Sequence, residues 1–238
     1  MFPVHPFRRF RLSTCVAKHR GAVFAGGTFF CYTIGTLAKG AKSPKMKILL
    51  ILGHPNPDSF NHAIALKTIS VLEKLGHEMI VHDLYHEQFD PVLPKGEENM
   101  PEENLPEYLQ GHIRDFRETT GAVFIHPNWW GGPPAILRGW VDRIIRSKSC
   151  YDFTKDGVVS YVGGKTVQIF STSNTPRDVE LNVYGDPIEN FWKTIVFGLL
   201  GTQSFERRNF EPVVLSTMEE RQHWLDEVEM ILVRRFKN

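Results

Sequence analysis

The sequence predicts an α/β protein in which a five-stranded parallel sheet lies between two layers of helices. Two observations predict it. Five segments are predicted as strands, at 47–53, 78–84, 121–125, 165–170 and within 202–210, and the first of them is a short, continuous apolar run typical of a strand buried on both faces. These segments alternate with segments of helical periodicity, an order that gives parallel strands and helices on both faces of a doubly wound sheet.

Met46 leads directly into the first predicted strand, and the first helix follows after a loop. The run 47–53 (KILLILG) ends in glycine and leads into a polar loop. A helix is then expected to about Leu75, where Gly76 is a typical stop. The residues predicted for its inward-facing stripe are Ala65, Leu66, Ile69 and Leu72.

The middle of the chain contains one long irregular segment. After the second strand, residues 89–110 are rich in Pro and Glu, and we expect a surface excursion that serves a site or an interface. A short helix over 112–119 and the third strand follow. Pro134 stands at a natural first helical position. The helix it opens has an apolar face formed by Ile136, Leu137, Trp140, Val141, Ile144 and Ile145.

Two further helices complete the alternation. Pro187 opens a helix after the fourth strand, and its expected inward residues are Ile188, Phe191, Trp192, Ile195 and Leu199. The last helix is expected to begin at a capping box from Ser216 to Glu219, a pattern that satisfies free backbone N–H groups at a helix start. Its predicted inward residues are Trp224, Val228, Ile231 and Leu232.

Residues 1–45 differ in composition from the rest of the chain. They hold eight basic residues and no Asp or Glu, whereas 46–238 holds 20 basic and 27 acidic residues, a net of −7. Three interpretations stay open: a non-native extension before a true start at Met46, which we favour, a targeting peptide, or a short membrane anchor in the uncharged stretch 21–38. That stretch is rich in Gly and Thr and would be a weak span, so we do not expect membrane contact. One domain is therefore expected over 46–238.

Charge and cysteine usage exclude several classes of function. The net charge of the whole chain is +1, so no overall field attracts nucleic acid or a membrane surface. Cys15, Cys31 and Cys150 form no C-x-x-C pair. We therefore expect neither a disulfide framework nor a metal site, and we expect a reducing, cytoplasmic compartment.

Ligands of an open parallel sheet bind at the carboxyl ends of its strands, so the loops there are the candidate site. The first loop, 54–61 (HPNPDSFN), matches neither a G-x-G-x-x-G nor a P-loop pattern. It nevertheless places Ser59 and Asn61 at a helix start, where free N–H groups and the helix dipole suit a phosphate. The alternative is that Ser59 only caps the helix.

The loops after the third and fourth strands also have unusual composition. Trp129 and Trp130 are adjacent and cannot both point inward from a strand, although one of them packing in the core is an open alternative. Gly131 next to Gly132 permits close approach of the backbone to a flat ligand. The later loop, 171–174 (STSN), suits hydrogen bonding to a polar ring edge, or ordinary turn chemistry.

Taken together, these loops resemble the flavodoxin-like NAD(P)H:quinone oxidoreductase family. The most specific part of the resemblance is Pro127-x-x-Trp130-x-Gly132-x-Pro134 and the Ala-Ile-Leu-Arg-Gly-Trp-Val-Asp-Arg that follows it. The resemblance implies a flavodoxin-like fold and a bound FMN or FAD, with NAD(P)H as co-substrate. It assigns His54, Ser59, Phe60 and Asn61 to the flavin phosphates, Pro127, Asn128, Trp129, Trp130 and Gly131 to the isoalloxazine ring, and Ser171, Thr172, Ser173 and Asn174 to its pyrimidine end.

The activity that the resemblance implies is two-electron transfer, as a hydride, from NAD(P)H to a quinone or a similar acceptor. The flavin carries this chemistry, and the order of events is ping-pong. Relatives form homodimers in which the second subunit completes the acceptor pocket. A Tyr and a His relay the proton in the family. In this chain Tyr184 stands at the His position and Asp178 near the Tyr position, so these are the candidate catalytic residues and the proton donor is open.

Two other classes of function stay open at the level of sequence. One is a flavin-binding ancillary subunit of a potassium efflux system, and the other is an electron carrier of the flavodoxin type. The modest −7 charge of 46–238 and the Trp-rich loop favour a reductase over a carrier. The sequence leaves open FMN or FAD, NADH or NADPH, and the physiological acceptor.

Overall fold

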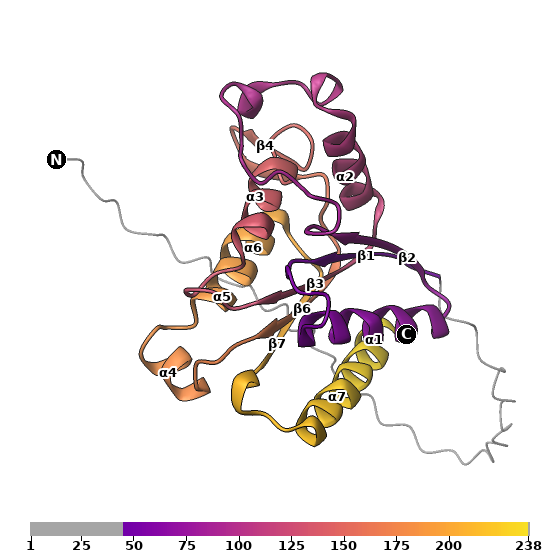
Figure 1. The fold of residues 1–238 in the computed structure, drawn as a ribbon. Helices are drawn as coiled ribbons and strands as arrows, with labels where there is room; N and C mark the ends of the chain where they lie inside the picture. The colour runs from indigo at the N-terminus through magenta and orange to yellow at the C-terminus, as the bar shows by residue number, and fades with distance from the viewer. Residues whose placement is uncertain (1–44, 238) are drawn as a thin grey trace, which may run out of the picture. The chain divides into compact units, whose positions relative to one another are not determined.

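A computed structural model describes residues 45–237 of the chain (Figure 1). The three interpretations of the N-terminal extension concern residues that, apart from Lys45, lie outside this described part. Within 45–237, no helix has the length and apolar character needed to cross a membrane.

Five parallel strands form the central sheet, as the alternation of apolar runs predicts. Their order across the sheet is β2-β1-β3-β6-β7. The order reverses between β1 and β3, and in such folds the ligand binds beside that reversal. The strands are β1 (Lys47–Leu52), β2 (Glu78–Asp83), β3 (Gly121–Pro127), β6 (Thr166–Thr172) and β7 (Ser204–Phe210).

Helices cover both faces of the sheet. The helices α1 (Phe60–Lys74) and α7 (Met218–Phe236) lie side by side on one face (Figure 1). The other face carries α2 (Glu107–Glu118), α3 (Ala135–Ile144) and the consecutive segments α5 (Pro187–Glu189), η3 (Asn190–Val196) and α6 (Phe197–Leu200). Strand β1 therefore contributes to two cores, since its side chains alternate between the faces.

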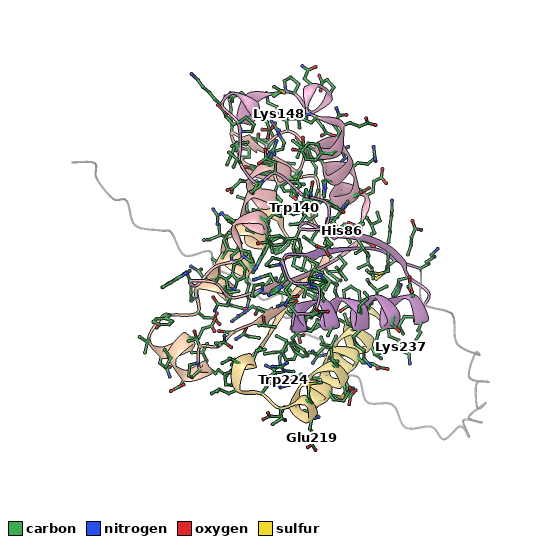
Figure 2. All side chains as sticks on the ribbon, in the orientation of Figure 1. His86, Trp140, Lys148, Glu219, Trp224 and Lys237 are labelled. Carbon is green, nitrogen blue, oxygen red and sulfur yellow. The ribbon has the colours of Figure 1, made fainter. Side chains whose placement is uncertain are left out.

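The core on the α3 side is built around large aromatic rings. Trp140 is fully buried and lies among densely packed side chains (Figure 2). The Phe124 ring from β3 lies between it and Trp192, with centroid distances of 5.8 Å to Trp140 and 4.8 Å to Trp192. The predicted inward face of α3 is confirmed, and the Pro134 that was expected to be its first residue is its N-cap.

The inward residues of two other helices differ from the prediction. Leu66 is 69% exposed because α1 turns Ile64, Thr68 and Val71 toward the sheet instead. Ile195 and Leu199 are also exposed, because η3 is a π-helix. Its wider turn rotates the residues after it relative to a regular α-helix, and Val196, Phe197 and Leu200 are buried in their place.

The irregular segment between β2 and β3 is shorter than the predicted surface excursion over 89–110, and buried contacts hold it against α3. Helix α2 begins at Glu107, five residues before the predicted start at 112, because Leu109 belongs to its buried face. Two short 3₁₀ turns, η1 (Glu97–Asn99) and η2 (Glu102–Asn104), precede it. The guanidinium of Arg143 on α3 donates to both carboxylate oxygens of Glu97, at 2.8 and 2.6 Å, in a buried pair. This ion pair attaches the excursion to α3.

Three features were not predicted from the sequence. An antiparallel hairpin, β4 (Tyr151–Thr154) with β5 (Gly157–Ser160), follows α3, and a short helix α4 (Arg177–Asn182) follows β6. The 3₁₀ turn η4 (Val213–Leu215) precedes α7. The capping box of α7 is one residue later than predicted: Thr217 Oγ1 accepts from the Glu220 N–H at 3.1 Å, and the Glu220 carboxylate accepts from the Thr217 N–H.

Candidate functional site

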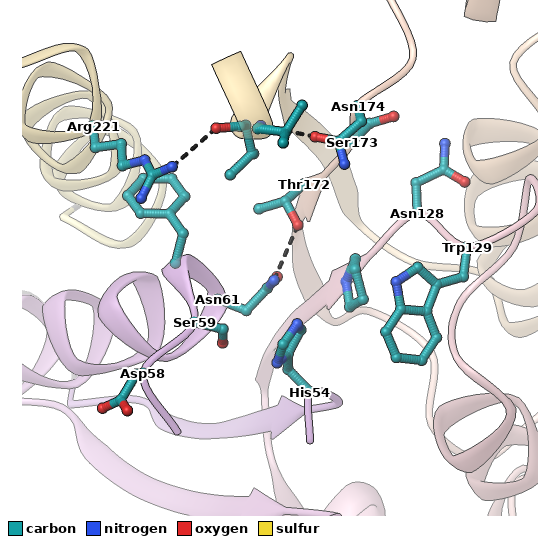
Figure 3. A pocket seen from close by; sticks show the side chains of 14 residues that line it. His54, Asp58, Ser59, Asn61, Asn128, Trp129, Thr172, Ser173, Asn174 and Arg221 are labelled. Carbon is teal, nitrogen blue, oxygen red and sulfur yellow. Dashed lines mark hydrogen bonds between the residues drawn. The ribbon is translucent and has the colours of Figure 1, made fainter. Parts of the chain in front are cut away.

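A pocket of about 320 Å³ opens at the carboxyl ends of β1, β3 and β6, where the topology places a ligand (Figure 3). Three loops predicted to form the site meet in it, together with residues from η4 and α7. The residues that line it are His54, Asp58, Ser59, Phe60, Asn61, Pro127, Asn128, Trp129, Thr172, Ser173, Asn174, Val213, Val214 and Arg221.

The start of α1 forms one wall of the pocket. Ser59 caps this helix, because its hydroxyl accepts a hydrogen bond from the His62 N–H at 3.3 Å. The first N–H groups of a helix have no partner inside the helix, and the dipole adds positive charge there. Ser59 can therefore cap the helix while the remaining free N–H groups of its first turn are available to a phosphate.

Asn61 connects this wall to the loop after β6. Its side-chain Nδ2 donates to Thr172 Oγ1 at 3.0 Å, and both side chains are buried. The other amide atom, Oδ1, is buried without a hydrogen-bond partner among the described residues. A buried acceptor without a donor is unfavourable, so this oxygen suits a ligand that carries hydroxyl groups.

The rings of His54 and Trp129 are neighbours in the lining of the pocket (Figure 3). Their ring centroids are 6.1 Å apart. Burial lowers the pKa of His54, and its Nδ1 accepts a hydrogen bond from the Asn56 N–H at 3.1 Å. The lowered pKa favours the neutral form of the ring, whose Nδ1 accepts this hydrogen bond.

Arg221 is the basic residue that the sequence did not identify. It lies in the first turns of α7, and its guanidinium donates to the Val213 carbonyl at 3.0 Å and to Ser216 Oγ at 2.9 Å. No local motif marks it, since it reaches the pocket only because α7 packs beside α1. The carboxylate of Asp58 also lines the pocket but points away from its centre (Figure 3).

The two tryptophans after β3 form a tight turn. The Trp129 N–H donates to the Gly132 carbonyl at 3.0 Å, and the Gly132 N–H donates back at 3.1 Å. Trp130 and Gly131 have φ values of 55° and 74°, the geometry of a type I′ turn. Neither tryptophan packs in the core, because Trp129 is 43% exposed and Trp130 is fully exposed.

Five predicted site residues do not line the pocket. Trp130 and Gly131 form the tip of the turn, and Ser171 is buried beneath the site, where its Oγ donates to Asn209 Oδ1 at 2.8 Å. Tyr184 and Asp178, the candidate catalytic residues, are exposed near α4. Their role stays a prediction.

A second cluster of titratable groups lies at the edge strand of the sheet, between β2 and α2. His82 Nδ1 is 2.9 Å from Glu87 Oε1, and its Nε2 is 3.1 Å from Asp115 Oδ2. His112 Nε2 lies 3.4 Å from the other Glu87 oxygen. Burial lowers the pKa of His82, but the hydrogen bonds and charges of Glu87 and Asp115 outweigh it, so the pKa is raised.

The hydrogen bonds of this cluster indicate where its protons lie. The indole N–H of Trp140 donates to His112 Nδ1 at 3.1 Å, so the proton of a neutral His112 is on Nε2 and faces Glu87. Burial raises the pKa of Glu87, but the hydrogen bonds from His112 and His82 lower it to about 2. The cluster is therefore a network of hydrogen-bonded ion pairs that links α2 to β2. Because Nδ1 of His112 accepts from Trp140 and its Nε2 carries the proton, His112 has no free lone pair for a metal ion.

The comparisons with known proteins agree with this fold. A family model described as a flavodoxin-like fold matches residues 46–230, which is most of the chain. The chain belongs to this family. It is similar to an uncharacterized NAD(P)H oxidoreductase of Haemophilus influenzae, with 31% identity over 142 residues that cover 58% of this chain and 70% of that protein.

Another curated relative is more distant. NAD(P)H dehydrogenase [quinone] 1 of Cavia porcellus is 26% identical over 172 residues, which cover 60% of this chain and 62% of that protein. The chain therefore spans less than two thirds of this relative.

Two solved structures are similar in fold. Smu.1420 from Streptococcus mutans is 31% identical, with a TM-score of 0.70 over 78% of this chain and 98% of that one. An FMN-dependent NADH-azoreductase from Bacillus anthracis, solved in complex with FMN, has a TM-score of 0.68 over 81% of this chain and the whole of that one. At 17% identity, this second likeness concerns the fold alone.

Proposed function

We propose that this protein is a flavin-dependent NAD(P)H oxidoreductase that passes two electrons, as a hydride, to a quinone or a similar acceptor. The observation that carries the proposal is the pocket at the carboxyl ends of the strands. Of the thirteen residues expected to bind a flavin, all except Trp130, Gly131 and Ser171 line it. They come from three loops far apart in the sequence.

The chemistry of the pocket fits the parts of FMN or of the FMN half of FAD. The start of α1 and the guanidinium of Arg221 supply N–H donors and positive charge for a phosphate. The buried Oδ1 of Asn61, which has no hydrogen-bond partner within residues 45–237, would accept a hydrogen bond from a ribityl hydroxyl. Pro127 and Trp129 offer apolar surface to an aromatic ring, and Ser173 with Asn174 offers polar groups to its edge.

A bound flavin would supply the redox chemistry, accepting a hydride from NAD(P)H and giving it to the acceptor. The protein's own residues would bind and orient the two partners in turn. Donors in the loop after β6 would stabilise negative charge on the ring edge, and the side chains of His54 and Trp129 would limit access of water. The names of the relatives, which include NAD(P)H oxidoreductase and quinone dehydrogenase, support this proposal.

The most direct test is aerobic oxidation of NADH and NADPH by the purified protein with menadione as acceptor. Mass analysis of the released flavin decides between FMN and FAD. Turnover that depends on both the flavin and menadione is the expected result. A flavin that is reduced without turnover would favour a carrier or an ancillary subunit, and failure to bind either FMN or FAD would overturn the proposal.

Tyr184 and Asp178 remain the proposed catalytic residues, with Tyr184 as the proton donor. Tyr184 is 60% exposed and does not line the pocket. We expect Tyr184→Phe to lower kcat with menadione by at least roughly tenfold, since a positioned acid contributes about 10²–10⁴-fold. FMN affinity should not change. Unchanged turnover would remove Tyr184 from the mechanism.

The proposed assembly is a homodimer in which the second subunit completes the acceptor pocket. Analytical ultracentrifugation at micromolar concentration measures this directly. A monomer that turns over menadione at full rate would show that one chain suffices.

A further inference from the structure

The Trp129–Gly132 turn holds a bulky residue in an unfavourable conformation. Trp130 has a φ of 55°, in the left-handed region that suits Gly, Asn and Asp. Gly131 follows with a φ of 74°, and a side chain there would also lie 3.1 Å from Pro187. A residue such as Trp130 persists in this region only where its surroundings enforce the geometry.

Besides the two backbone hydrogen bonds between Trp129 and Gly132, Asn128 holds this geometry. Its side-chain Oδ1 accepts a hydrogen bond from the Gly131 N–H at 3.1 Å, across the turn. Its backbone N–H donates to the Thr172 carbonyl and so continues the pairing of β3 with β6. The Oδ1 must face an N–H, which leaves Nδ2 to donate to a different group.

That group is the carboxylate of Glu180 on α4. Asn128 Nδ2 donates to Glu180 Oε1 at 3.0 Å, and Glu180 is only 2% exposed. Its second oxygen accepts from Asn209 Nδ2 at 3.4 Å. A buried carboxylate whose oxygens both accept from side-chain amides holds those amides in one orientation.

Glu180 is itself fixed by a buried cation. The guanidinium of Arg207 on β7 is 3.7 Å from Glu180 Oε1. It also donates to both oxygens of Asp186, at 2.5 and 2.6 Å, and to Glu189 at 3.2 Å. Arg207 on the edge strand β7 therefore contacts α4 through Glu180 and the start of α5 through Asp186 and Glu189.

We propose that Glu180 is a positioning residue for the turn beside the pocket. Its carboxylate orients the amide of Asn128, Asn128 holds the Gly131 N–H, and the turn is kept in the form in which Trp129 lines the pocket. The hydrogen bonds that connect Glu180 on α4 to the turn do not depend on the proposed function. Only the expected effect on flavin binding rests on it.

The test uses ¹⁹F NMR of the full chain labelled with 5-fluorotryptophan. The five tryptophans give separate resonances that single Trp→Phe variants assign. We expect Glu180→Gln to shift or broaden the Trp129 and Trp130 resonances. Those of the buried Trp140 and Trp192 should not move. The dissociation constant of FMN should rise by roughly tenfold, the size of one lost hydrogen bond.

The matched control is Glu227→Gln. Glu227 accepts two hydrogen bonds from Arg208, at 2.6 and 2.9 Å, and this pair does not touch the turn. Weakening this ion pair should lower the free energy of unfolding without moving the Trp129 or Trp130 resonance. This control separates a positioning effect from a general loss of stability.

A double-mutant cycle decides whether the effect passes through Asn128. In the Asn128→Ala background, Glu180→Gln should cause no further change in the Trp130 resonance. Wild-type resonances in Glu180→Gln, or fully additive changes in the double variant, would overturn the inference. If the wild-type chain binds no flavin, the proposed function fails while the ¹⁹F data still decide the coupling.

Discussion

Arg221 adds the positive charge of a guanidinium to the lining of the pocket. Its guanidinium is held by the Val213 carbonyl and by Ser216 Oγ, so it is oriented before a ligand arrives. An oriented guanidinium loses less side-chain entropy when it binds an anion, and it donates in a geometry that suits phosphate. At the scale of single residues, Arg221 is thus the clearest point at which to test the proposed phosphate site.

We predict that Arg221→Ala weakens FMN binding by roughly ten- to a hundredfold, since a hydrogen bond to a charged group contributes about 1.5–3 kcal/mol. Isothermal titration calorimetry measures the change. Arg234→Ala is the matched control, because Arg234 lies on the same helix and pairs with Glu206 away from the pocket. Equal affinities for the Arg221 variant and the wild type would place the phosphate elsewhere.

At the scale of elements, Gly139 shows how closely the excursion packs on α3. A Cβ at Gly139 would lie 2.2 Å from the Pro91 carbonyl oxygen and 2.5 Å from the Pro91 Cα. These are backbone atoms that a rotamer change does not move. Helix propensity alone would favour Ala here by about 1 kcal/mol, but the packing opposes it.

We predict that Gly139→Ala destabilises the protein by at least about 1–3 kcal/mol, the usual effect of overpacking. Gly111→Ala on α2 is the matched control, since its Cβ would meet only the end of the Arg114 side chain at 3.8 Å. That variant should be neutral or stabilising by up to about 1 kcal/mol. Urea unfolding of both proteins measures the difference, and equal midpoints would contradict the packing shown between Pro91 and α3.

The His82 cluster couples the attachment of α2 to pH. The pKa of His82 is raised in the folded protein, so its contribution to stability is fully present below its unfolded value near 6.5. That contribution is lost as the pH rises through the raised folded pKa. The pKa of Glu87 is lowered to about 2, so its contribution is present above 4.5 and is lost as the pH falls toward 2.

We predict that the free energy of unfolding of the wild type exceeds that of His82→Gln most strongly near pH 5.5, and that the gap narrows toward pH 8.5. Chemical denaturation at several pH values checks this. His86→Gln, at an exposed position in the turn after β2, is the control for replacing a histidine with glutamine. A gap for His82→Gln that stays constant with pH would mean that the cluster does not titrate as inferred.

At the scale of the whole molecule, ligand binding and folding are linked, because the pocket requires three loops and α7 together. FMN at about 100 times its dissociation constant should stabilise the folded state by about 2.7 kcal/mol. For a domain of this size, we predict a rise in Tm of roughly 5–10 °C. Thermal scans in increasing FMN measure the rise.

Riboflavin, which lacks the phosphate, is the control for that experiment. It should give a smaller shift in Tm than FMN at equal concentration, and Arg221→Ala should reduce the gap between the two ligands. Equal shifts for FMN and riboflavin would show that the start of α1 and Arg221 do not bind the phosphate.

The sequence by itself determined the fold and predicted where the candidate site lies. The continuous run from Ile48 to Leu52 indicates a strand buried on both faces, and its alternation with helical segments leaves few topologies other than a doubly wound parallel sheet. Because ligands bind at the carboxyl ends of such strands, the unusual loops could be assigned to one site before the structure was known. These inferences use short-range patterns, which a sequence records directly.

Only the tertiary structure decided which side chains meet. Asn61 and Thr172 are 111 residues apart in sequence, and Arg221 joins their pocket because α7 packs against α1. The π-helix at 190–196 shifted the buried face of its segment, and Glu180 was buried on a helix that no periodicity indicated. Such contacts depend on the packing of elements distant along the chain, and local propensity and periodicity carry no information about that packing.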